Sequence, residues 1–359
     1  MATGPNGNNM EFVYNAHPAR VIFGVGARNK VAEELDRLNI KRAIVLSTPD
    51  QSLIAGEFAK MIGDRAAIVY PGAAQHTPVE VTETALQAAE SVHADGCLAI
   101  GGGSTTGLSK AIALRTDLPQ LIVPTTFAGS EMTPIIGQTE GGRKTTQNTT
   151  KVLPETVIYD PELTRTMPTF ISGPSGMNAI AHSVEGLYAK ERNPIISMMA
   201  EESIAALGRA LPVLMDDPDN LEAHTHALYG AWLAGCVLGA VGMAIHHKLC
   251  HTLGGTFNLP HADLHALMIP YSAAYNREAA SEAMARVARA LGAQDGPSAL
   301  FDLMQKTTRH KSLKELGLTP SGLDKAAEQA VQNPYYNPRP VTREGVRELL
   351  EKAYLGERP

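Results

Sequence analysis

Four histidines fall within the sixteen residues of "HHKLCHTLGGTFNLPH". His247 and His251 are four positions apart, a spacing that places two side chains on one face of a helix. Asn178 and His182 repeat this spacing in the earlier segment "SGMNAIAHSVEG". A lone histidine on an apolar helix is more often a hydrogen-bonded core residue, but several at helical spacing favour one shared site. We therefore expect His182, His247, His251 and His261 to meet.

The chemistry of this cluster depends on whether it holds a metal. Three imidazoles could bind zinc, or ferrous iron if a carboxylate joins them. At the position four residues before His182 stands Asn178, whose neutral amide is a weak ligand. Glu185 could substitute, but it could equally be a surface acid in a salt bridge. The residues alone leave a metal site and a metal-free imidazole site both open.

A glycine-rich turn is the second candidate site. The segment "CLAIGGGSTTGLSK" places three glycines between an apolar strand-like run and a helix that should begin near Ser104. Glycine allows the backbone to approach a ligand closely, and the free N–H groups of a helix N-terminus attract phosphate. The turn has the form of a pyrophosphate site. Its pattern matches neither GxGxxG nor the P-loop, and a purely structural turn is the alternative.

A second polar turn, "PTTFAGSEMTP", follows the next strand-like run. Open α/β sheets bind ligands outside the carboxyl ends of their strands, so two polar turns at adjacent strand ends favour a dinucleotide. The predicted cofactor contacts in the two turns are Gly101, Gly102, Gly103, Ser104, Pro124, Thr125, Thr126, Phe127, Ala128, Ser130 and Thr133.

The order of patterns along the chain predicts two domains. Apolar runs of strand length at 42–48, 66–72, 96–103 and 121–126 alternate with helical patterns at 29–38 and 79–93, and β-like pieces at 135–140 and 156–160 follow. This alternation predicts an α/β dinucleotide-binding domain over 10–164, with a parallel sheet and crossover helices. Residues 165–359 read as an all-helical catalytic domain, and residues 1–9 as a disordered extension. We expect the active site in the cleft between the two domains.

Composition excludes several classes of protein. The 359 residues are 44% hydrophobic and 19% charged, without an apolar run of membrane-spanning length, so we expect no membrane partner. A net charge of −6 and the lack of a basic stripe argue against nucleic acid. Three cysteines without CxxC spacing are typical of a reducing cytoplasm rather than of a disulfide scaffold.

With these segments the chain resembles the iron-containing alcohol dehydrogenase superfamily, and within it the maleylacetate reductases. The segments "TTFAGSEMTP", "SGMNAIAHSVEGLYA", "HHKLCHTLGGTFNLPHADLHA" and "NPYYNPRP" carry the resemblance to the subgroup. The metal-dependent members bind iron or zinc through one aspartate and three histidines. The resemblance places these ligands at His182, His247 and His261, with Asn178 in place of the aspartate and His251 as an active-site histidine that does not ligate the metal. It therefore implies that no metal is needed.

The resemblance also bears on the cofactor, which it implies to be NADH, NADPH or both. Lys144 matches a lysine that contacts the cofactor in relatives. Where the superfamily often has an aspartate after the glycine turn, this chain has Gly107, and the first strand ends in Thr48 rather than in aspartate or glycine. An acid at the strand end would repel a 2′-phosphate, so its absence leaves both coenzymes open.

The activity implied by the resemblance is reduction of maleylacetate, and possibly chloromaleylacetate, to 3-oxoadipate in the degradation of aromatic compounds. Hydride addition leaves an enolate whose charge must be stabilised, a role we expect for hydrogen bonds from His182, His247, His251 and the amide of Asn178. His246, Lys248, Arg339 and Tyr336 are candidates for binding the dicarboxylate, and Tyr335 with Tyr336 could close the cleft. A homodimer is typical of relatives. The alternatives are a metal-dependent alcohol or polyol dehydrogenase and a catalytically silent nucleotide-binding protein.

Overall fold

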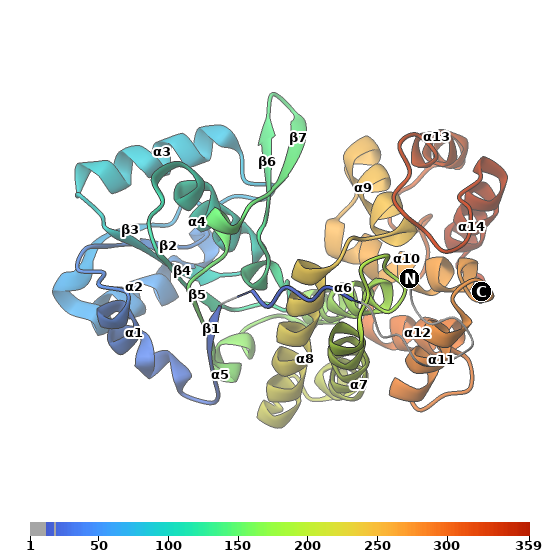
Figure 1. The fold of residues 1–359 in the computed structure, drawn as a ribbon, viewed down its shortest axis with the longest axis horizontal. Helices are drawn as coiled ribbons and strands as arrows, with labels where there is room; N and C mark the ends of the chain where they lie inside the picture. Colours follow the sequence, from blue (N-terminus) through green and yellow to red (C-terminus); the bar gives the residue numbers. More distant parts are fainter. Residues whose placement is uncertain (1–11, 18) are drawn as a thin grey trace. The chain divides into compact units, whose positions relative to one another are not determined.

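The computed structural model describes residues 12–17 and 19–359, apart from the side chain of Lys144. The predicted extension at residues 1–9 lies outside this part of the chain. Two compact units make up the described fold: one spans His17–Met167, and the other joins the described residues before His17 to Pro168–Pro359. Figure 1 shows the strands in the first of them and long helices in the second.

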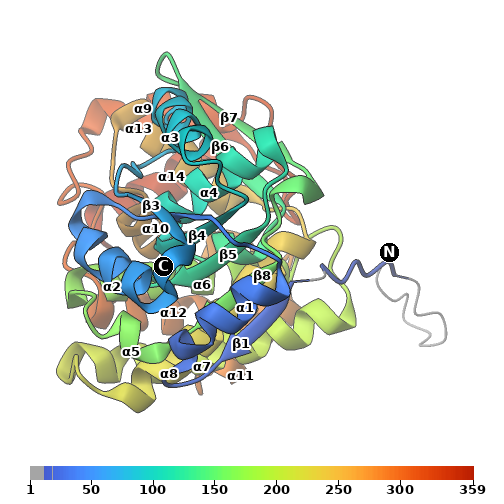
Figure 2. The ribbon, with the colours of Figure 1, turned by 90° about the vertical axis from the view of Figure 1, so that its left-hand side faces the viewer.

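The first unit is built on a six-stranded parallel sheet with the strand order β1-β8-β5-β4-β2-β3. Figure 2 shows these strands side by side, from β1 to β3. The bounds are β1 Arg20–Phe23, β2 Ala43–Leu46, β3 Ala66–Tyr70, β4 Gly96–Gly101, β5 Gln120–Pro124 and β8 Thr156–Tyr159. The central strands are apolar on both faces because helices cover both faces, as parallel sheets require. The predicted parallel α/β unit is confirmed.

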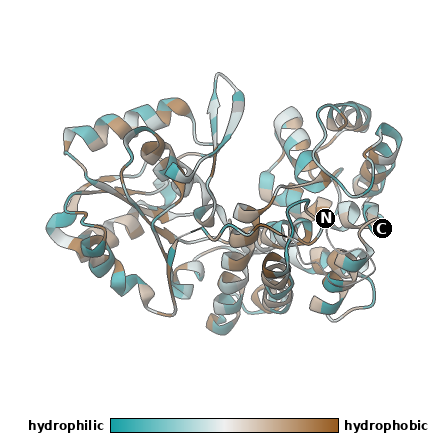
Figure 3. Cartoon of the chain, in the orientation of Figure 1, coloured by the Kyte–Doolittle hydropathy of each residue, from teal (hydrophilic) through white to brown (hydrophobic). Residues whose placement is uncertain are grey.

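Helices connect these strands as crossovers: α1 Val31–Arg37, α2 Ser52–Ile62, α3 Val79–Ser91 and α4 Gly103–Thr116, with a short α5 Pro161–Thr164 at the end of the unit. In Figures 1 and 2, α1 and α2 lie below the sheet and α3 and α4 above it. Leu35 of α1 and Phe58 of α2 pack on Val45, Leu98 and Ile100 of the strands, which forms the core below the sheet. Figure 3 shows hydrophilic and hydrophobic residues alternating along α3, as expected for a helix with one exposed face.

One predicted β segment lies outside the parallel sheet. β6 Ile135–Glu140 pairs antiparallel with β7 Arg143–Asn148 in a separate two-stranded hairpin. The turn is made by Gly141 and Gly142, both with positive φ. Because most side chains of β7 are polar and exposed, its sequence carries no signal of a buried strand.

Among the described residues of the second unit, the regular elements are helices and no strand is present, which confirms the predicted fold class. Its helices are α6 Thr169–Gly186, α7 Pro194–Asp216, α8 Leu221–Ala240, α9 Ile245–Phe257, α10 His261–Tyr275, α11 Ser281–Ala290, α12 Gly296–Thr307, α13 Pro320–Ala330 and α14 Arg343–Leu355. No single described helix is long and apolar enough to cross a membrane. α8 and α9 pass that test of length and composition only as a pair, bent by 95°.

The central helix α6 is buried along almost its whole length. Its glycines permit this, because neighbouring helices occupy the space of a side chain. A Cβ at Gly176 would lie 2.4 Å from Leu211 of α7, and one at Gly186 would lie 2.2 Å from Val237 of α8. Close approach of the neighbouring helices keeps α6 rigid. The polar residues of α6 are therefore held in fixed positions inside the unit.

Candidate active site

The two polar turns of the sheet unit lie side by side. β4 and β5 are neighbours in the sheet, with Gly101 opposite Pro124. The backbone N–H of Thr125 donates to the carbonyl of Gly101 at 3.2 Å, and the amide of Gln51 donates to the Thr125 hydroxyl at 2.8 Å. The prediction that both turns stand at adjacent strand ends is confirmed. Binding of a dinucleotide there stays a prediction.

The glycines of the first turn are required by their surroundings. Gly101 has a φ of 155°, and a Cβ built on it would lie 2.3 Å from the hydroxyl of Thr105. A Cβ on Gly102 would lie 2.8 Å from the hydroxyl of Thr126. No side-chain hydrogen bond caps the N-terminus of α4. The backbone N–H groups at the start of α4 are therefore not occupied by a capping side chain, and such N–H groups suit a phosphate.

The predicted cofactor residues differ in how accessible they are. Those at least partly accessible are Gly102, Gly103, Ser104, Thr126, Ala128 and Ser130. Phe127 is fully buried and Thr133 is 2% exposed, so these two support the turn from within. Lys144 lies on β7 opposite Thr139, and its side chain is outside the described part of the chain.

Lys110, which the sequence analysis did not single out, holds the second turn in place. Its buried Nζ lies 2.5 Å from the carbonyl oxygen of Ser130, 2.7 Å from that of Thr133 and 2.9 Å from that of Ile135. Burial lowers the pKa of Lys110 to about 7, and nearby Glu131 opposes this shift. The three carbonyl oxygens around Nζ can only accept hydrogen bonds, and an uncharged amine has only two hydrogens to donate. The three acceptors therefore fit the ammonium form of Lys110, which has three hydrogens.

Lys110→Met is expected to lower the free energy of unfolding by about 3 kcal/mol, because the caged carbonyl oxygens lose their donor inside the protein. Binding of NADH should weaken as the turn loosens. Chemical denaturation and fluorescence titration measure the two effects. Lys151→Met is the control, because its long contact with Asp117 (3.9 Å) joins two exposed side chains. Equal free energies of unfolding for the Lys110→Met and Lys151→Met variants would show that Lys110 does not hold the second turn in place.

Two further positions bear on the coenzyme. A Cβ on Gly107 would lie 2.3 Å from the hydroxyl of Thr77, so a longer side chain there would displace Thr77. Thr48 follows β2 and precedes a short 3-10 helix, Pro49–Gln51. It brings no charge to this strand end. The preference between NADH and NADPH stays open.

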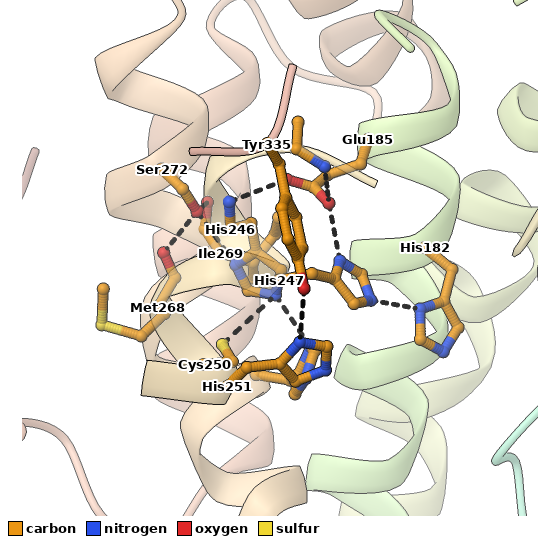
Figure 4. Close-up of polar contacts among 12 residues, drawn as sticks. His182, Glu185, His246, His247, Cys250, His251, Met268, Ile269, Ser272 and Tyr335 are labelled. Atoms are coloured by element: carbon orange, nitrogen blue, oxygen red, sulfur yellow. Dashed lines mark hydrogen bonds and ion pairs between the residues drawn. The ribbon is translucent and has the colours of Figure 1, made fainter. Parts of the chain in front are cut away.

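In the helical unit the structure brings the predicted histidines together. α6 carries Asn178 and His182, α9 carries His247 and His251, and α10 begins with His261. The Nδ1 atom of His182 lies 3.0 Å from Nε2 of His247 (Figure 4). The rings of His251 and His261 stack with their centroids 6.3 Å apart. His182 and His247 are buried, whereas His251 and His261 are exposed, so the cluster runs from the interior of the unit to its surface.

Glu185 is the most consequential residue that the sequence reading left undecided. The alternative of a surface acid is wrong, because Glu185 is fully buried. Its carboxylate accepts from the backbone N–H groups of Ala244 (2.8 Å) and His246 (2.7 Å), and from Nδ1 of His247 at 2.6 Å (Figure 4). It thus caps the N-terminus of α9, where the helix dipole favours an anion.

The charge state of this pair follows from its environment. Burial raises the pKa of Glu185 to about 7, although hydrogen bonds from the backbone of Ala244, His246 and His247 oppose this. Burial lowers the pKa of His247 to about 3. The imidazole of His247 is therefore neutral near pH 7 and has a single N–H to share. Glu185 becomes the ionised partner as the pH rises above 7.

His246 does not lie where its predicted contact with substrate requires. It is fully buried, with Nδ1 3.0 Å from the hydroxyl of Ser272 and Nε2 2.9 Å from Nδ1 of His265. Both ring nitrogens are thus engaged inside the protein. This position corrects the prediction that His246 binds the substrate. The prediction relied on His246 being next to His247 in the sequence, but adjacent residues of a helix point in different directions.

His265 belongs to the cluster, and the sequence reading missed it. Its ring centroid lies 4.4 Å from that of His261 and 4.7 Å from that of His247. The available signal was its spacing, since His265 follows His261 by one helical turn. Burial lowers the pKa of His265 well below its usual value, and nearby histidines lower it further. Its ring is neutral near pH 7.

The remaining predicted residues lie near the exposed end of the cluster or apart from it. The hydroxyl of Tyr335 is 3.3 Å from Nδ1 of His251, and Nζ of Lys248 lies 5.7 Å from the centre of the Tyr335 ring. Tyr336 and Tyr335 line a cavity of about 310 Å³. The guanidinium of Arg339 stacks 4.1 Å from the ring centre of Tyr275 and donates to its carbonyl at 3.2 Å. That contact gives Arg339 a structural partner, and its binding of substrate stays a prediction.

The superfamily's metal requires a donor set that this chain provides incompletely. At the four corresponding positions stand an amide and three imidazoles, with no anionic ligand. The buried Oδ1 of Asn178 has no hydrogen-bond partner within the described structure. Nitrogens of His246, His247 and His265 lie within 4.8 Å of one another, but His246 and His265 are outside the superfamily set and hydrogen-bond to each other. Without a carboxylate, the site does not fit ferrous iron.

Comparisons with known proteins agree with this geometry. Residues 18–161 match the family described as iron-containing alcohol dehydrogenase, and residues 173–354 match its C-terminal family. A maleylacetate reductase of Burkholderia cepacia is 53% identical over 97% of this chain and 99% of its own length. One from Rhodococcus opacus, named maleylacetate reductase 1, is 47% identical over 97% of this chain and 98% of its own length.

Solved structures extend the likeness to the whole fold. The crystal structure of maleylacetate reductase from Agrobacterium tumefaciens has a TM-score of 0.95 and 52% identity, covering 97% of this chain and 99% of that one. A 1,3-propanediol oxidoreductase with 23% identity has a TM-score of 0.89 over 96% of this chain and all of its own, a likeness of fold alone. The chain therefore belongs to the iron-containing alcohol dehydrogenase superfamily and, within it, to the maleylacetate reductases.

Proposed function

We propose that this protein reduces maleylacetate to 3-oxoadipate with NADH or NADPH, and that it does so without a metal. The close relatives over nearly the full length carry that activity in their names. The observation that carries the metal-free part is the donor set, in which Asn178 replaces the anionic ligand beside the imidazoles of His182, His247 and His261. Chloromaleylacetate is proposed as a further substrate.

The proposed reaction is a balanced hydride and proton transfer. A hydride leaves the dihydronicotinamide and forms a C–H bond at one carbon of the substrate's double bond. The electron pair of that double bond moves toward the ketone, giving an enolate. A proton then adds to the neighbouring carbon as the ketone is restored, so one coenzyme and one proton are consumed per turnover. Hydrogen-bond donors aimed at the enolate oxygen would lower the barrier most.

The histidine cluster provides polar groups for this step. Its rings are fixed by contacts within the helical unit, so they need little reorganisation when charge develops. We propose that the polar turns after β4 and β5 bind the coenzyme, and that the histidine cluster binds the reacting part of the substrate. Lys248, Tyr336 and Arg339 remain candidates for the substrate carboxylates, which need cationic or hydrogen-bonding partners.

A cytoplasmic homodimer is proposed from the cysteine content and the usual state of relatives.

Oxidation of NADH in the presence of maleylacetate tests the proposal, with 3-oxoadipate identified by mass spectrometry. We expect turnover that depends on maleylacetate, with NADPH compared in parallel. Binding of NADH without turnover would instead favour a silent nucleotide-binding protein. Oxidation of simple alcohols or polyols with NAD, seen only after adding Fe²⁺ or Zn²⁺, would favour a metal-dependent dehydrogenase. The nearby nitrogens of His246, His247 and His265 are the feature that keeps this second candidate open.

A further inference from the structure

The inner histidines are oriented by a serine hydroxyl. Ser272 lies 2.8 Å from the carbonyl oxygen of Met268, which can only accept, so the hydroxyl must donate its single hydrogen there. The hydroxyl also lies 3.3 Å from the carbonyl oxygen of Ile269, which likewise can only accept, and 3.0 Å from Nδ1 of His246, so that nitrogen must donate. A neutral His246 then has a lone pair on Nε2, which accepts from Nδ1 of His265 at 2.9 Å. It follows that Nε2 of His265 is an acceptor.

A carboxylate orients the second pair in the same sense. Ionised Glu185 can only accept, so Nδ1 of His247 carries the hydrogen at 2.6 Å. Nε2 of His247 is then a lone pair and accepts from Nδ1 of His182 at 3.0 Å. A neutral His182 would in turn have a lone pair on its Nε2. Each hydrogen-bonded chain therefore ends in a ring nitrogen that can only accept, Nε2 of His265 in one and Nε2 of His182 in the other. The oxygen of an enolate instead needs hydrogen-bond donors.

This result changes the roles expected from sequence. His182 and His247 were expected to donate hydrogen bonds to the substrate, together with His251 and the amide of Asn178. When Glu185 is ionised, His247 donates its only N–H to that carboxylate, and His182 donates its Nδ1–H to His247. His251 is the predicted donor whose orientation is set by a different kind of group. Its Nδ1 lies 3.3 Å from the phenol of Tyr335 (Figure 4).

We propose that Tyr335 makes His251 the hydrogen-bond donor of the cluster. A phenol donates readily to an unprotonated ring nitrogen, so the Tyr335 hydroxyl places the lone pair of His251 on Nδ1 and its hydrogen on Nε2. His251 would then donate from Nε2 to the oxygen on which the enolate charge develops. Tyr335 is a positioning residue, because it acts through His251. This inference rests on the proposed function and names which histidine performs it.

The segment between α13 and α14 is built to hold Tyr335 at this place. The side-chain amides of Asn337 and Asn276 form a reciprocal pair, with N···O distances of 2.9 and 2.8 Å. The hydroxyl of Tyr275, the last residue of α10, donates to the carbonyl of Pro340 at 2.7 Å. These bonds tie an irregular segment to the end of α10. Lys248 reaches over the ring of Tyr335 from α9.

Removing the hydroxyl tests the proposal. Tyr335→Phe should lower kcat for maleylacetate about 10-fold, the scale of effect for groups that orient a site histidine, with KM changed less than kcat. Tyr354→Phe, which removes a tyrosine hydroxyl on α14, is the matched control and should keep wild-type kcat. A kcat of Tyr335→Phe within twofold of wild type would overturn the proposal, as would a change in KM alone.

Variants of His251 test whether Tyr335 affects kcat by setting the tautomer of His251 or by another route. Glutamine places its amide N–H near the position of Nε2, whereas asparagine places it near Nδ1. His251→Gln should therefore keep a higher kcat than His251→Asn. In the His251→Gln background, Tyr335→Phe should have no further effect on kcat, because an amide has no tautomer to set. A full 10-fold effect in that background would show that Tyr335 acts by another route.

Nitrogen-15 NMR of the histidine-labelled protein gives a readout that does not depend on turnover. The His251 resonances, assigned by their loss in His251→Gln, should show an unprotonated Nδ1 and a protonated Nε2, and Tyr335→Phe should mix the two tautomers. A protonated Nδ1 in the wild-type protein would refute the inference even if the enzyme is active. Absence of turnover in the wild type, with the expected tautomer present, would instead count against the proposed function.

Discussion

Glu185→Gln is expected to lower kcat for maleylacetate reduction about 100-fold, because a buried group that orients an active-site histidine contributes on that scale. The carboxylate accepts from three N–H groups, of Ala244, His246 and His247. A glutamine has only one oxygen, and its NH2 group would face N–H donors. The ring of His247 would then have to reverse its hydrogen or turn away, which disturbs its contact with His182. Steady-state kinetics, with the binding of NADH measured separately, test this.

The control for this change is Glu191→Gln. Glu191 also accepts from a backbone N–H before α9, that of Gly242 at 3.1 Å, but it makes no contact with a histidine in the described structure. We expect its kcat to stay within twofold of wild type. Unfolding midpoints of both variants show whether folding is affected. If Glu185→Gln is as active as Glu191→Gln while both are folded, Glu185 has no part in orienting the site.

Asn178→Asp is expected to convert the site into one that binds metal. The change adds a carboxylate to three imidazoles at the positions that hold iron or zinc in metal-dependent relatives. The Oδ1 atom of Asn178 is buried and has no partner among the described residues, so an aspartate there would need a cation close by. A divalent ion supplies that charge, and a carboxylate is the ligand that ferrous iron usually requires.

Elemental analysis of the purified variant measures this directly. About one Fe or Zn per chain should be present after growth with those metals, and little in the wild type purified in parallel. Maleylacetate reductase activity should fall, because the ion would take the lone pairs of His182 and His247. If the variant is folded but contains no metal, the absence of a carboxylate is not what separates this chain from the metal-dependent relatives.

The sequence predicted the fold well where a pattern had one physical cause. The runs that became β2, β4 and β5 are apolar because both sheet faces are covered, and they were identified at nearly the observed bounds. The hairpin of β6 and β7 was not distinguished from the sheet, because pairing partners depend on long-range contacts that a local pattern does not contain. α2 follows β2 closely, after the short 3-10 helix that begins at Pro49, and was also missed.

The site was predicted only in part, for a similar reason. Helical spacing placed His182, His247 and His251 correctly on shared faces. It could not show that Glu185 faces inward, because one turn of helix offers both buried and exposed positions. Which nitrogen of each ring carries hydrogen depends on groups such as Ser272 and Tyr335, which are distant in sequence. Those contacts become visible only in the folded unit.

The central feature of the proposed mechanism is that imidazoles, rather than an ion, stabilise the charge on the substrate. The direct test is the turnover of maleylacetate by wild-type protein dialysed exhaustively against o-phenanthroline and EDTA, with its metal content measured on the same sample. We predict full activity with far less than one metal ion per chain. Loss of activity in step with metal content, restored by Fe²⁺ or Zn²⁺, would contradict it.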